Sequence, residues 1–265
     1  MLINIFIKQV PESIDIEMDA KTHTLCRESI AYQTNPFDLF ALEEGLLLKE
    51  KYGGKTRVLS MGPPQAVKAL EESLSMGADD AYLLSDPLFS GADTYATSYT
   101  LSSVLKLIGI GDLILVGKQA TDGDTGQVGP ELAEHLKITH VTNVRSIKEI
   151  INGKKVIISK MTEKGTALLE VELPALLTIT KTDKEPRTPT LRDIVQSKRK
   201  FIDIFDSKRL KIDTMKTGLK GSPTKVIKTF KPEYTSEGRI FPMSDSISLS
   251  ILLKELQKKQ ENNVE

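Results

Sequence analysis

The chain has 265 residues, with 36 basic and 36 acidic side chains that balance to a formal net charge of zero. This length suits one large domain, or one domain with an appendage. The balanced charge argues against a general basic face for nucleic acid, and no apolar run approaches the roughly 20 residues of a membrane span. Cys26 is the only cysteine, which excludes an internal disulfide. With no basic leader at the N-terminus, this predicts a cytoplasmic protein.

The first half of the chain alternates short apolar runs with helical patterns. Strands are predicted at 2–7, 55–61, 81–84 and 113–116. Helices are predicted from Asn35-Pro36, Pro63-Pro64, Asp93-Thr94 and Glu131 onward. Strands that alternate with helices of this length predict an α/β fold with a doubly wound, mostly parallel sheet.

The pattern changes after residue 140. Three runs at 141–151, 154–161 and 166–173 follow one another with no helical pattern between them. Asn152-Gly153 is a strong signal for a type I′ hairpin turn, and Lys164-Gly165 marks a second turn. We therefore expect an antiparallel meander added to the sheet, followed by a further strand at 175–179.

The remainder of the chain is polar and rich in glycine and proline. Residues 181–192 contain two prolines and are predicted to form an exposed loop. Residues 201–243 are predicted to be irregular, and 244–257 to form a helix with one leucine stripe. Such a stretch needs a partner surface. We therefore predict an α/β domain at 1–195, which includes the loop 181–195, and an extended C-terminal arm at 196–265 that packs on another chain.

The most informative segment is 117–130, GKQATDGDTGQVGP, between the predicted strand 113–116 and the helix at Glu131. A strand that ends in a loop of small residues and opens a helix presents unpaired backbone N–H groups to an anion. The positive end of the helix dipole points to the same place. Ligands of open α/β sheets bind there, beyond the carboxyl ends of strands. The segment therefore predicts a cradle for a phosphate or a dinucleotide.

A series of motifs, spread over nearly the whole chain, resembles the beta subunit of electron-transfer flavoproteins. Each motif is weak alone, but their order and separations are specific. They are Lys8-Gln9-Val10-Pro11, Asn35-Pro36-Phe37-Asp38, Glu43-Glu44, Ser60-Met61-Gly62-Pro63, Met76-Gly77-Ala78-Asp79, Gly117-Lys118-Gln119-Ala120, Asp122 through Val128, Leu173-Pro174-Ala175 and Glu185-Pro186-Arg187. The resemblance implies an adenine-nucleotide-binding type of fold, and a heterodimer with an alpha subunit that carries FAD.

The resemblance also implies a nucleotide in this chain, and two branches of the family differ in its identity. One branch carries AMP, which scaffolds the alpha-subunit flavin without adding a redox centre. The electron-bifurcating branch carries a second FAD, which accepts a hydride from NADH. Electrons then pass to ferredoxin or flavodoxin and, through the alpha-subunit FAD, to an acyl-CoA dehydrogenase. The short loop 122–127 and the segment 91–98 resemble the bifurcating branch. A nucleotide sensor unrelated to electron transfer is a third hypothesis.

The cofactor-binding residues that the resemblance implies lie at strand ends and in the loops that follow. They are Phe6, Asn35, Pro36, Phe37, Asp38, Met61, Gly62, Asp93, Thr94, Thr97, Gly117, Lys118, Gln119, Ala120, Thr121, Asp122, Gly123, Asp124, Thr125, Gly126, Gln127 and Val128. No catalytic acid–base set is expected, because a flavin itself performs the redox chemistry. No metal site is expected either, since the three histidines have no metal-like spacing.

Several of these residues also have a plain structural interpretation. Asn35 either faces an adenine edge or only caps its helix, and Gly62 either admits a ligand or makes a turn. The hydroxyls of Thr94 and Thr97 either reach a flavin or only start a helix. Two bare carboxylates, Asp122 and Asp124, would repel a diphosphate, so we expect them to cap backbone N–H groups or to bind ribose hydroxyls. Main-chain N–H groups at 125–128 are expected to bind phosphate.

Leu191 aligns with the apolar anchor of the family's partner-recognition loop, which docks acyl-CoA dehydrogenases. An apolar side chain on an otherwise polar loop is a physically sensible hot spot. The alternative is a leucine that packs against its own domain. The basic run Lys198-Arg199-Lys200 either steers an acidic dehydrogenase surface or is simply solvated.

Overall fold

The computed structural model describes residues 1–12, 31–227 and 249–254. The strands are β1 (Leu2–Phe6), β2 (Gln9–Pro11), β3 (Tyr32–Thr34), β4 (Lys55–Met61), β5 (Asp80–Leu84), β6 (Leu113–Gly117), β7 (Thr139–Ile151), β8 (Lys155–Thr162), β9 (Gly165–Glu172), β10 (Ala175–Ile179) and β11 (Ile202–Phe205). The helices are α1 (Pro36–Tyr52), α2 (Val67–Met76), α3 (Thr94–Ile108), α4 (Val128–Leu136), α5 (Leu191–Ser197), α6 (Ser207–Leu210) and α7 (Gly218–Gly221), with 3-10 turns η2 (Pro64–Ala66), η3 (Pro87–Phe89) and η4 (Thr214–Lys216).

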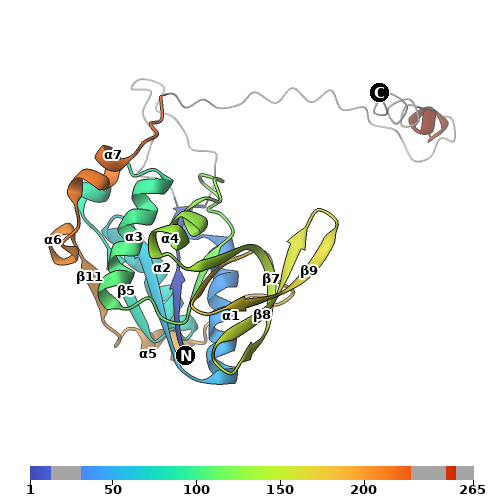
Figure 1. The fold of residues 1–265 in the computed structure, drawn as a ribbon, viewed down its shortest axis with the longest axis horizontal. Helices are drawn as coiled ribbons and strands as arrows, with labels where there is room; N and C mark the ends of the chain where they lie inside the picture. Colours follow the sequence, from blue (N-terminus) through green and yellow to red (C-terminus); the bar gives the residue numbers. More distant parts are fainter. Residues whose placement is uncertain (13–30, 228–248, 255–265) are drawn as a thin grey trace. The chain divides into compact units, whose positions relative to one another are not determined.

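A nine-stranded sheet forms the centre of the α/β unit, in the order β11-β5-β4-β1-β6-β10-β7-β8-β9 (Figure 1). The strands from β11 to β7 pair in parallel. The long strand β7 then turns into the antiparallel meander β7-β8-β9. The predicted α/β fold, with its doubly wound, mostly parallel sheet and added meander, is confirmed. A small antiparallel pair, β2 with β3, was not anticipated.

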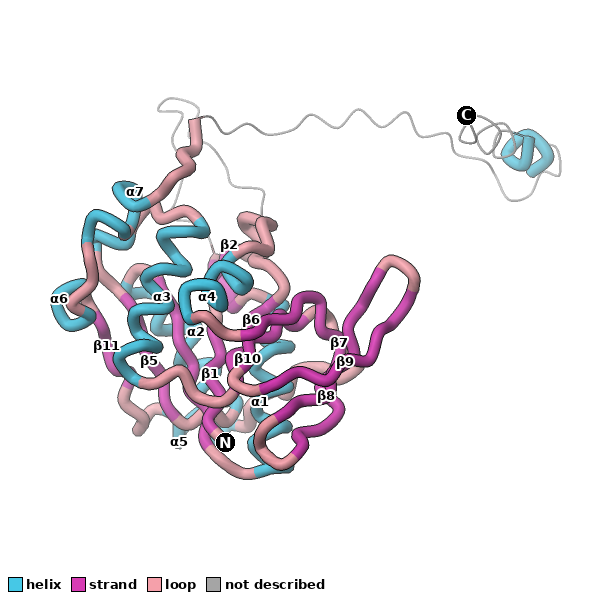
Figure 2. The backbone as a smooth tube through the Cα atoms, in the orientation of Figure 1, coloured by secondary structure: helices cyan, strands magenta, loops and turns pink. Residues whose placement is uncertain are grey.

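Helices cover both faces of the sheet, with α1 and α2 on one face and α3 and α4 on the other (Figures 1 and 2). Strand β6 shows why its residues read as a continuous apolar run. Leu113 and Leu115 pack in the core of the first face, and Ile114 and Val116 in that of the second. Successive side chains of a strand point to opposite faces, so a strand covered on both sides needs apolar residues at every position.

A turn at Asn152-Gly153 joins β7 and β8, as predicted, and its backbone has the positive φ values that a type I′ turn requires. Both residues have positive φ, 51° and 64°, and the N–H of Lys154 donates to the carbonyl of Ile151 at 3.0 Å. Asparagine and glycine tolerate this left-handed backbone better than other residues. The turn therefore fixes the register between β7 and β8.

The chain after β10 is more regular than its composition predicted. Residues 202–205, expected to be irregular, form the edge strand β11 and pair with β5. Helix α5 begins at Leu191, inside the stretch expected to be a loop. The expectation was wrong because a four-residue strand carries almost no periodicity of its own. The start of α5 did carry a signal, since Thr190 and Asp193 form a reciprocal capping box.

By its internal contacts the chain divides after Lys225 into the units Met1–Lys225 and Val226–Glu265. Residues 249–254 of the second unit are helical, as the sequence predicted, whereas the rest of the predicted helix 244–257 lies outside the described residues. Cys26 and His23 also lie outside them. That an arm from 196 onward packs on another chain stays a prediction. Within the described ranges, no helix is both long enough and apolar enough to cross a membrane.

Candidate functional site

The predicted cradle lies where the strand order of the sheet reverses. From the central strand β1 the chain first adds β4 and β5 on one side, and then returns to place β6 on the other. The helices that follow β1 and β6 cover opposite faces, so the chain segments that leave these two paired strands diverge at their carboxyl ends. Ligands of open α/β sheets bind at such a switch point. The loop 118–127 and the start of α4 surround it.

Asn35 holds the loop in place rather than capping its helix. Its side chain is 1% exposed and makes no capping hydrogen bond to α1. Instead, Nδ2 donates to the carbonyl of Gln119 at 2.9 Å, and Oδ1 accepts the N–H of Thr121 at 3.2 Å. Both ends of the side-chain amide thus bind the loop, and the interpretation that Asn35 only caps its helix is wrong.

Asp38 ties together the ends of β1 and β6. Its two carboxylate oxygens accept the main-chain N–H groups of Lys8, at 2.8 Å, and of Gly117, at 3.0 Å. Burial raises the pKa of this carboxyl to about 7, although the hydrogen bonds and the Lys8 ammonium oppose the shift. A Cβ on Gly117 would lie 2.2 Å from Oδ1 of Asp38. The position of Asp38 therefore excludes a side chain at residue 117. Asp38 stabilises the site by binding the two strand ends that lead to it.

The two aspartates of the loop bind side chains and not backbone N–H groups. Both carboxylate oxygens of Asp122 accept from Nζ of Lys8 at 2.7 Å, and Oδ1 of Asp124 accepts from the Gln119 amide at 2.6 Å. The expected role as backbone caps is therefore wrong. Within the described residues, no group of three or more metal-ligating side chains occurs.

The start of α4 presents a row of unused main-chain donors. Over the part of the chain that the structure describes, the N–H groups from Thr125 to Gly129 meet no hydrogen-bond acceptor. Asp124 and Gly126, with φ of 52° and 63°, bend the loop just before this row. Gly129 is buried, and a Cβ there would lie 2.8 Å from Cγ2 of Thr178. The glycine thus brings the first turn of α4 close against the sheet, with its positive dipole end at the switch point.

Helix α3 begins beside this row of donors. Asp93 caps α3 through the N–H of Ala96, at 3.0 Å, as expected of a helix start. The Thr94 hydroxyl donates to Oε1 of Glu131 in the first turn of α4, at 3.1 Å. Thr97, also in the first turn of α3, is half-buried, and its N–H donates to the carbonyl of Asp93. The two helix starts therefore converge, joined by a side-chain contact.

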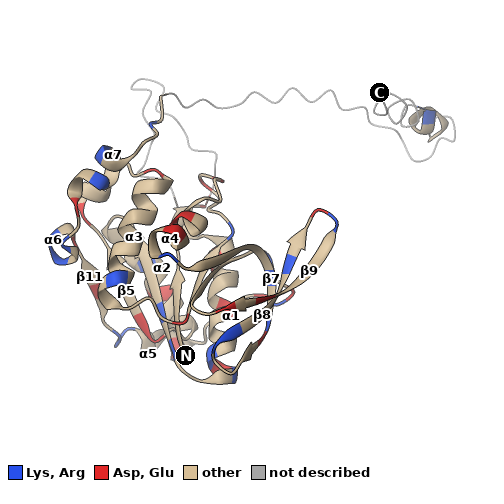
Figure 3. Ribbon diagram, in the orientation of Figure 1, with Lys and Arg blue, Asp and Glu red and all other residues tan. Residues whose placement is uncertain are grey.

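Glu131, in the first turn of α4, is half-buried by this arrangement. Burial raises the pKa of its carboxyl, while the hydroxyls of Thr94 and Ser98 lower it by donating hydrogen bonds. Figure 3 shows the acidic segments of α4 beside the beginning of α3. A carboxylate in the first turn of a helix is favourable in itself, but it also opposes a second anion nearby.

The remaining residues that the sequence singled out lie at strand ends and in the segments that follow them. Phe6 is buried in the core between the sheet and α3–α4, with Met61 against the same core. Pro36 and Phe37 are half-buried at the start of α1. The N–H of Gly62 donates to the carbonyl of Leu84. Lys118, Ala120 and Gly123 belong to the loop itself, where Lys118 N–H continues the sheet by donating to Ile179.

From the sequence alone, two residues that contact the predicted site residues, Lys8 and Glu131, were not assigned to the site. Lys8 stands in the motif Lys8-Gln9-Val10-Pro11, directly after the first strand, where position alone indicated the site. Glu131 was used only as a marker of the helix start. Its contact with Thr94 depends on how α3 packs against α4, which no local pattern reveals.

Leu191 projects from the start of α5 with 82% of its surface exposed. The interpretation that it packs against its own domain is therefore wrong, while its role in partner binding stays a prediction. Of the basic run that follows, Lys200 donates from Nζ to the carbonyl of Ala78, so this lysine is not free to steer a partner. The ring of His135, on α4, contacts those of Tyr95 and Tyr99.

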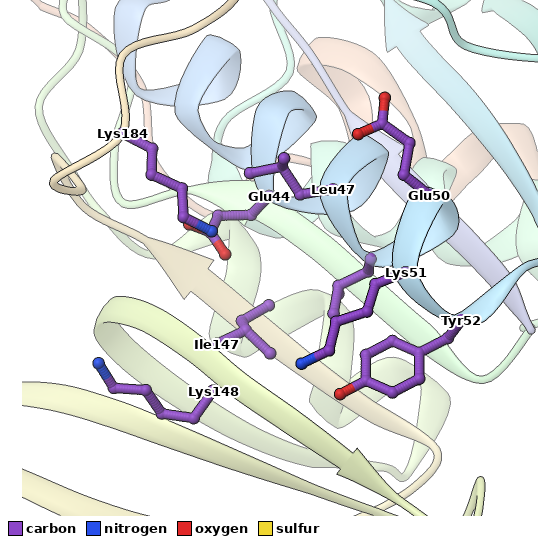
Figure 4. A pocket seen from close by; sticks show the side chains of 9 residues that line it. Glu44, Leu47, Glu50, Lys51, Tyr52, Ile147, Lys148 and Lys184 are labelled. Carbon is purple, nitrogen blue, oxygen red and sulfur yellow. The ribbon is translucent and has the colours of Figure 1, made fainter.

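A hollow of about 390 Å³ lies elsewhere, between the last turns of α1 and strand β7 (Figure 4). Lys51, Lys148 and Lys184 line it, together with Tyr52 and the buried Glu44, toward which Lys184 points. Helix α1 returns from the carboxyl edge of the sheet to its amino edge, so this end of α1 lies away from the switch point. The hollow is therefore separate from the cradle.

Comparison with known proteins identifies the family of this fold and site. The model of the electron transfer flavoprotein domain matches residues 22–207. An electron transfer flavoprotein subunit beta from Thermoanaerobacterium thermosaccharolyticum is 43% identical over 98% of this chain and 99% of its own length, and one from Megasphaera elsdenii is 41% identical over 97% of both chains. The caffeyl-CoA reductase-Etf complex subunit CarD of Acetobacterium woodii is 42% identical over 91% of both. The chain therefore belongs to the electron transfer flavoprotein family and is similar throughout to its beta subunits.

Proposed function

We propose that this chain is the small subunit of a heterodimeric electron-transfer flavoprotein that binds FAD at the β1–β6 switch point. In this proposal the complex accepts a hydride from NADH and bifurcates the electrons. One path leads to ferredoxin or flavodoxin, and the other leads through the alpha-subunit FAD to an acyl-CoA dehydrogenase. The single cysteine favours a cytoplasmic setting.

The row of five main-chain N–H groups from Thr125 to Gly129 is the observation that carries the proposal. Each is a donor without an acceptor within the described chain, and unpaired amides at the start of a helix suit a diphosphate. Asn35 and the Lys8–Asp122 ion pair hold the loop that leads to this row. The residues therefore fit the diphosphate of a dinucleotide.

The chain's own residues bind and position the cofactor, and FAD, when bound, supplies the redox chemistry. Amides at the start of α4 would hold the phosphate oxygens. Lys8 would hold the loop in place through its ion pair with Asp122. Asp38, buried beneath, keeps the ends of β1 and β6 at a fixed separation. Preorganised donors of this kind cost little reorganisation when a ligand arrives.

The first turn of α3 favours a ligand longer than a mononucleotide. It lies beside the cradle and carries the half-buried Thr97 as well as Thr94, whose hydroxyl already donates to Glu131. A flavin that extends past the diphosphate would find these polar groups.

The alternative is an AMP-binding subunit that scaffolds the alpha-subunit flavin and docks dehydrogenases. That Thr94 already has acceptors in Glu131 and Gln127 favours this second function, because α3 then needs no ligand contact.

The partner proposals have separate support. Leu191 is an exposed apolar side chain held in place by the Thr190–Asp193 capping box, which suits a hot spot for a dehydrogenase. One relative is named as a subunit of a caffeyl-CoA reductase-Etf complex, and this supports an oxidoreductase of CoA esters as partner. For the C-terminal arm we propose contact with the alpha subunit.

The decisive experiment is to count the nucleotides of the purified heterodimer. Acid extraction followed by chromatography separates FAD from AMP. Two FAD per heterodimer, with reduction of both by NADH, is the result expected. One FAD with one AMP would overturn the bifurcating proposal and leave the scaffold function.

A charge variant tests the cradle itself. Thr125 is exposed at the beginning of the donor row. Thr125→Glu places a carboxylate among the unpaired amides and is expected to weaken cofactor binding about tenfold or more, since like charges at close range cost several kcal/mol. Thr125→Gln has the same shape without the charge and is expected to bind as the wild type does. Equal loss in both variants would contradict the electrostatic argument.

A further inference from the structure

The last residues of the first unit fold back onto the start of α3. The N–H of Leu219 donates to the carbonyl of Ser90 at 3.0 Å, and Nζ of Lys216 lies 5.8 Å from the centre of the Tyr99 ring. A Cβ on Gly218, which has a φ of 54°, would lie 2.2 Å from the carbonyl oxygen of Leu88. Because only glycine fits here, this close approach to η3 is a built feature of the fold. We name residues 217–224 the clasp.

Asp93 is the residue on which the clasp closes. One carboxylate oxygen caps α3 at the N–H of Ala96. The other accepts both the N–H of Thr224, at 2.9 Å, and its hydroxyl, at 2.8 Å. The main-chain N–H of Asp93 in turn donates to the Ser222 hydroxyl at 2.8 Å. These bonds span about 130 residues of sequence, so they join two distant parts of the chain at one side chain.

The residue that follows Asp93 connects it to the cradle. Thr94, its neighbour, donates to Glu131 and lies 3.4 Å from Oε1 of Gln127. Gln127 belongs to the donor row at the start of α4, and Glu131 lies in the first turn of that helix. A continuous chain of hydrogen-bonded groups therefore runs from the cradle, through the first turn of α3, to Thr224. The second unit of the chain begins two residues later, at Val226.

We propose that the clasp positions the first turn of α3 for cofactor binding, and that a cofactor in the cradle tightens the clasp in return. The proposal rests on the function proposed above. Ser222 and Thr224 are then positioning residues, which act through Asp93 and Thr94 without touching the cofactor. Thermodynamic linkage requires that the effect be reciprocal: whatever the clasp adds to cofactor affinity, the cofactor adds to closure of the clasp.

Hydrogen exchange of the full-length chain, purified with its large subunit, tests the second half of this proposal. The alpha site is first saturated with FAD, and the small-subunit site is compared with and without a further equivalent of FAD. Amides in 217–225 are expected to exchange at least about fivefold more slowly when the second FAD is bound, within the usual range of coupling between sites. Unchanged exchange there would overturn the proposal.

Variants of Thr224 test the first half. Thr224→Val removes the hydroxyl that donates a hydrogen bond to Asp93. This variant is expected to raise the dissociation constant of the second FAD about fivefold. Thr224→Ser keeps the hydroxyl and is expected to restore wild-type affinity. Ser207→Ala is the matched control, because the Ser207 N–H and hydroxyl bind Asp86 in the same way, on the same C-terminal stretch but at η3. It is expected to leave the affinity unchanged.

The outcomes separate this proposal from the function on which it rests. If wild-type chain binds no second FAD, the proposed function fails first. If FAD binds, but with equal affinity in Thr224→Val and Thr224→Ser, the clasp has no positioning role and the function stands. If Ser207→Ala weakens FAD as much as Thr224→Val does, the effect comes from general loosening of the C-terminal stretch, and the clasp proposal is again overturned.

Discussion

Two loops leave neighbouring strands at the same edge of the sheet and have opposite characters. The loop after β6, residues 118–127, lies across the switch point and is fastened by the side-chain amide of Asn35. The loop after β10, residues 180–190, is fastened by Arg187, which binds both oxygens of Glu43 on α1 at 2.9 Å. The first ends in unpaired amides, and the second ends at the exposed side chain of Leu191.

On the function proposed above, this difference would let one edge carry a ligand site and a partner site without mixing them. A cradle has to keep its donors free, so its loop is held from below by neutral or paired groups that do not compete for the ligand. A docking loop has to present its tip at a fixed position, so it is held at its base by a partly buried ion pair. Variants of the residues that hold each loop can test this difference.

The largest effect is expected where the cradle loop begins. In Gly117→Ala the new Cβ would lie 2.2 Å from Oδ1 of Asp38 and 2.9 Å from its main-chain nitrogen. Since backbone atoms cannot move aside cheaply, we expect a loss of about 3 kcal/mol in the free energy of unfolding. Gly123→Ala is the control, because nothing lies within 4 Å of its Cβ. Urea unfolding of both variants measures the difference, and equal stability would show that Asp38 yields easily.

Arg187 is the corresponding test for the docking loop. Arg187→Met keeps the main-chain N–H that donates to Glu43 but leaves that carboxylate, which is 6% exposed, without its guanidinium partner. Breaking such a buried pair costs about 3 kcal/mol, or somewhat less where it is partly solvated. Arg145→Met is the matched control, because its ion pair with Asp183 is exposed and such pairs contribute about 0–1 kcal/mol. Chemical unfolding distinguishes the two, and a stable Arg187→Met would mean that the loop is held by other contacts.

These two fastenings also show what sequence reasoning reached. The apolar run of β6, the small-residue loop after it and the Asn152-Gly153 turn are local patterns, and the structure has them where they were predicted. The contacts that fasten the loops join residues 84 to 144 positions apart. No local pattern encodes such pairings, since they follow from the strand order. Asn35 is instructive because its position at a helix start favoured capping, and tertiary structure gave its amide another partner.

Asn35 offers a test that separates these two roles. Asn35→Asp would supply an acceptor for a helix cap but cannot donate to the carbonyl of Gln119. We expect it to lose about 1–2 kcal/mol of stability, like Asn35→Ala, because a buried acceptor is left unsatisfied. Cofactor binding should weaken in both. Full stability in Asn35→Asp, with a loss only in Asn35→Ala, would restore the capping interpretation.

Asp38 makes the cradle sensitive to pH. Its pKa is raised to about 7 in the folded chain from an ordinary 3.8, so between these values the folded state binds a proton that the unfolded state has released. The contribution of Asp38 to stability is therefore complete at low pH and lost as the pH rises through 7. A rise from about pH 5.5 to 6.5 should therefore lower the free energy of unfolding by about 1.4 kcal/mol.

Asp38→Asn provides the reference for that measurement. The amide oxygen can still accept one main-chain N–H group, but the side chain no longer titrates. Thermal unfolding across the same pH range should show a flatter profile in the variant than in the wild type. Parallel profiles would mean that the N–H groups of Lys8 and Gly117 stabilise the charged form enough to cancel the effect of burial.

Leu191 is expected to have the smallest effect on stability and the most selective effect on function. With 82% of its surface exposed, Leu191→Ala removes almost no buried area, so the free energy of unfolding should change by less than about 0.5 kcal/mol. If the side chain is a hot spot, the KM of a partner dehydrogenase for the heterodimer should rise about tenfold or more.

Leu168→Ala on β9, where the side chain is 69% exposed, is the control at a different surface. Equal effects of the two variants would show that general surface apolarity, and not this loop, determines docking. A fall in stability with Leu191→Ala would mean that the tip, like the base, is part of the fastening.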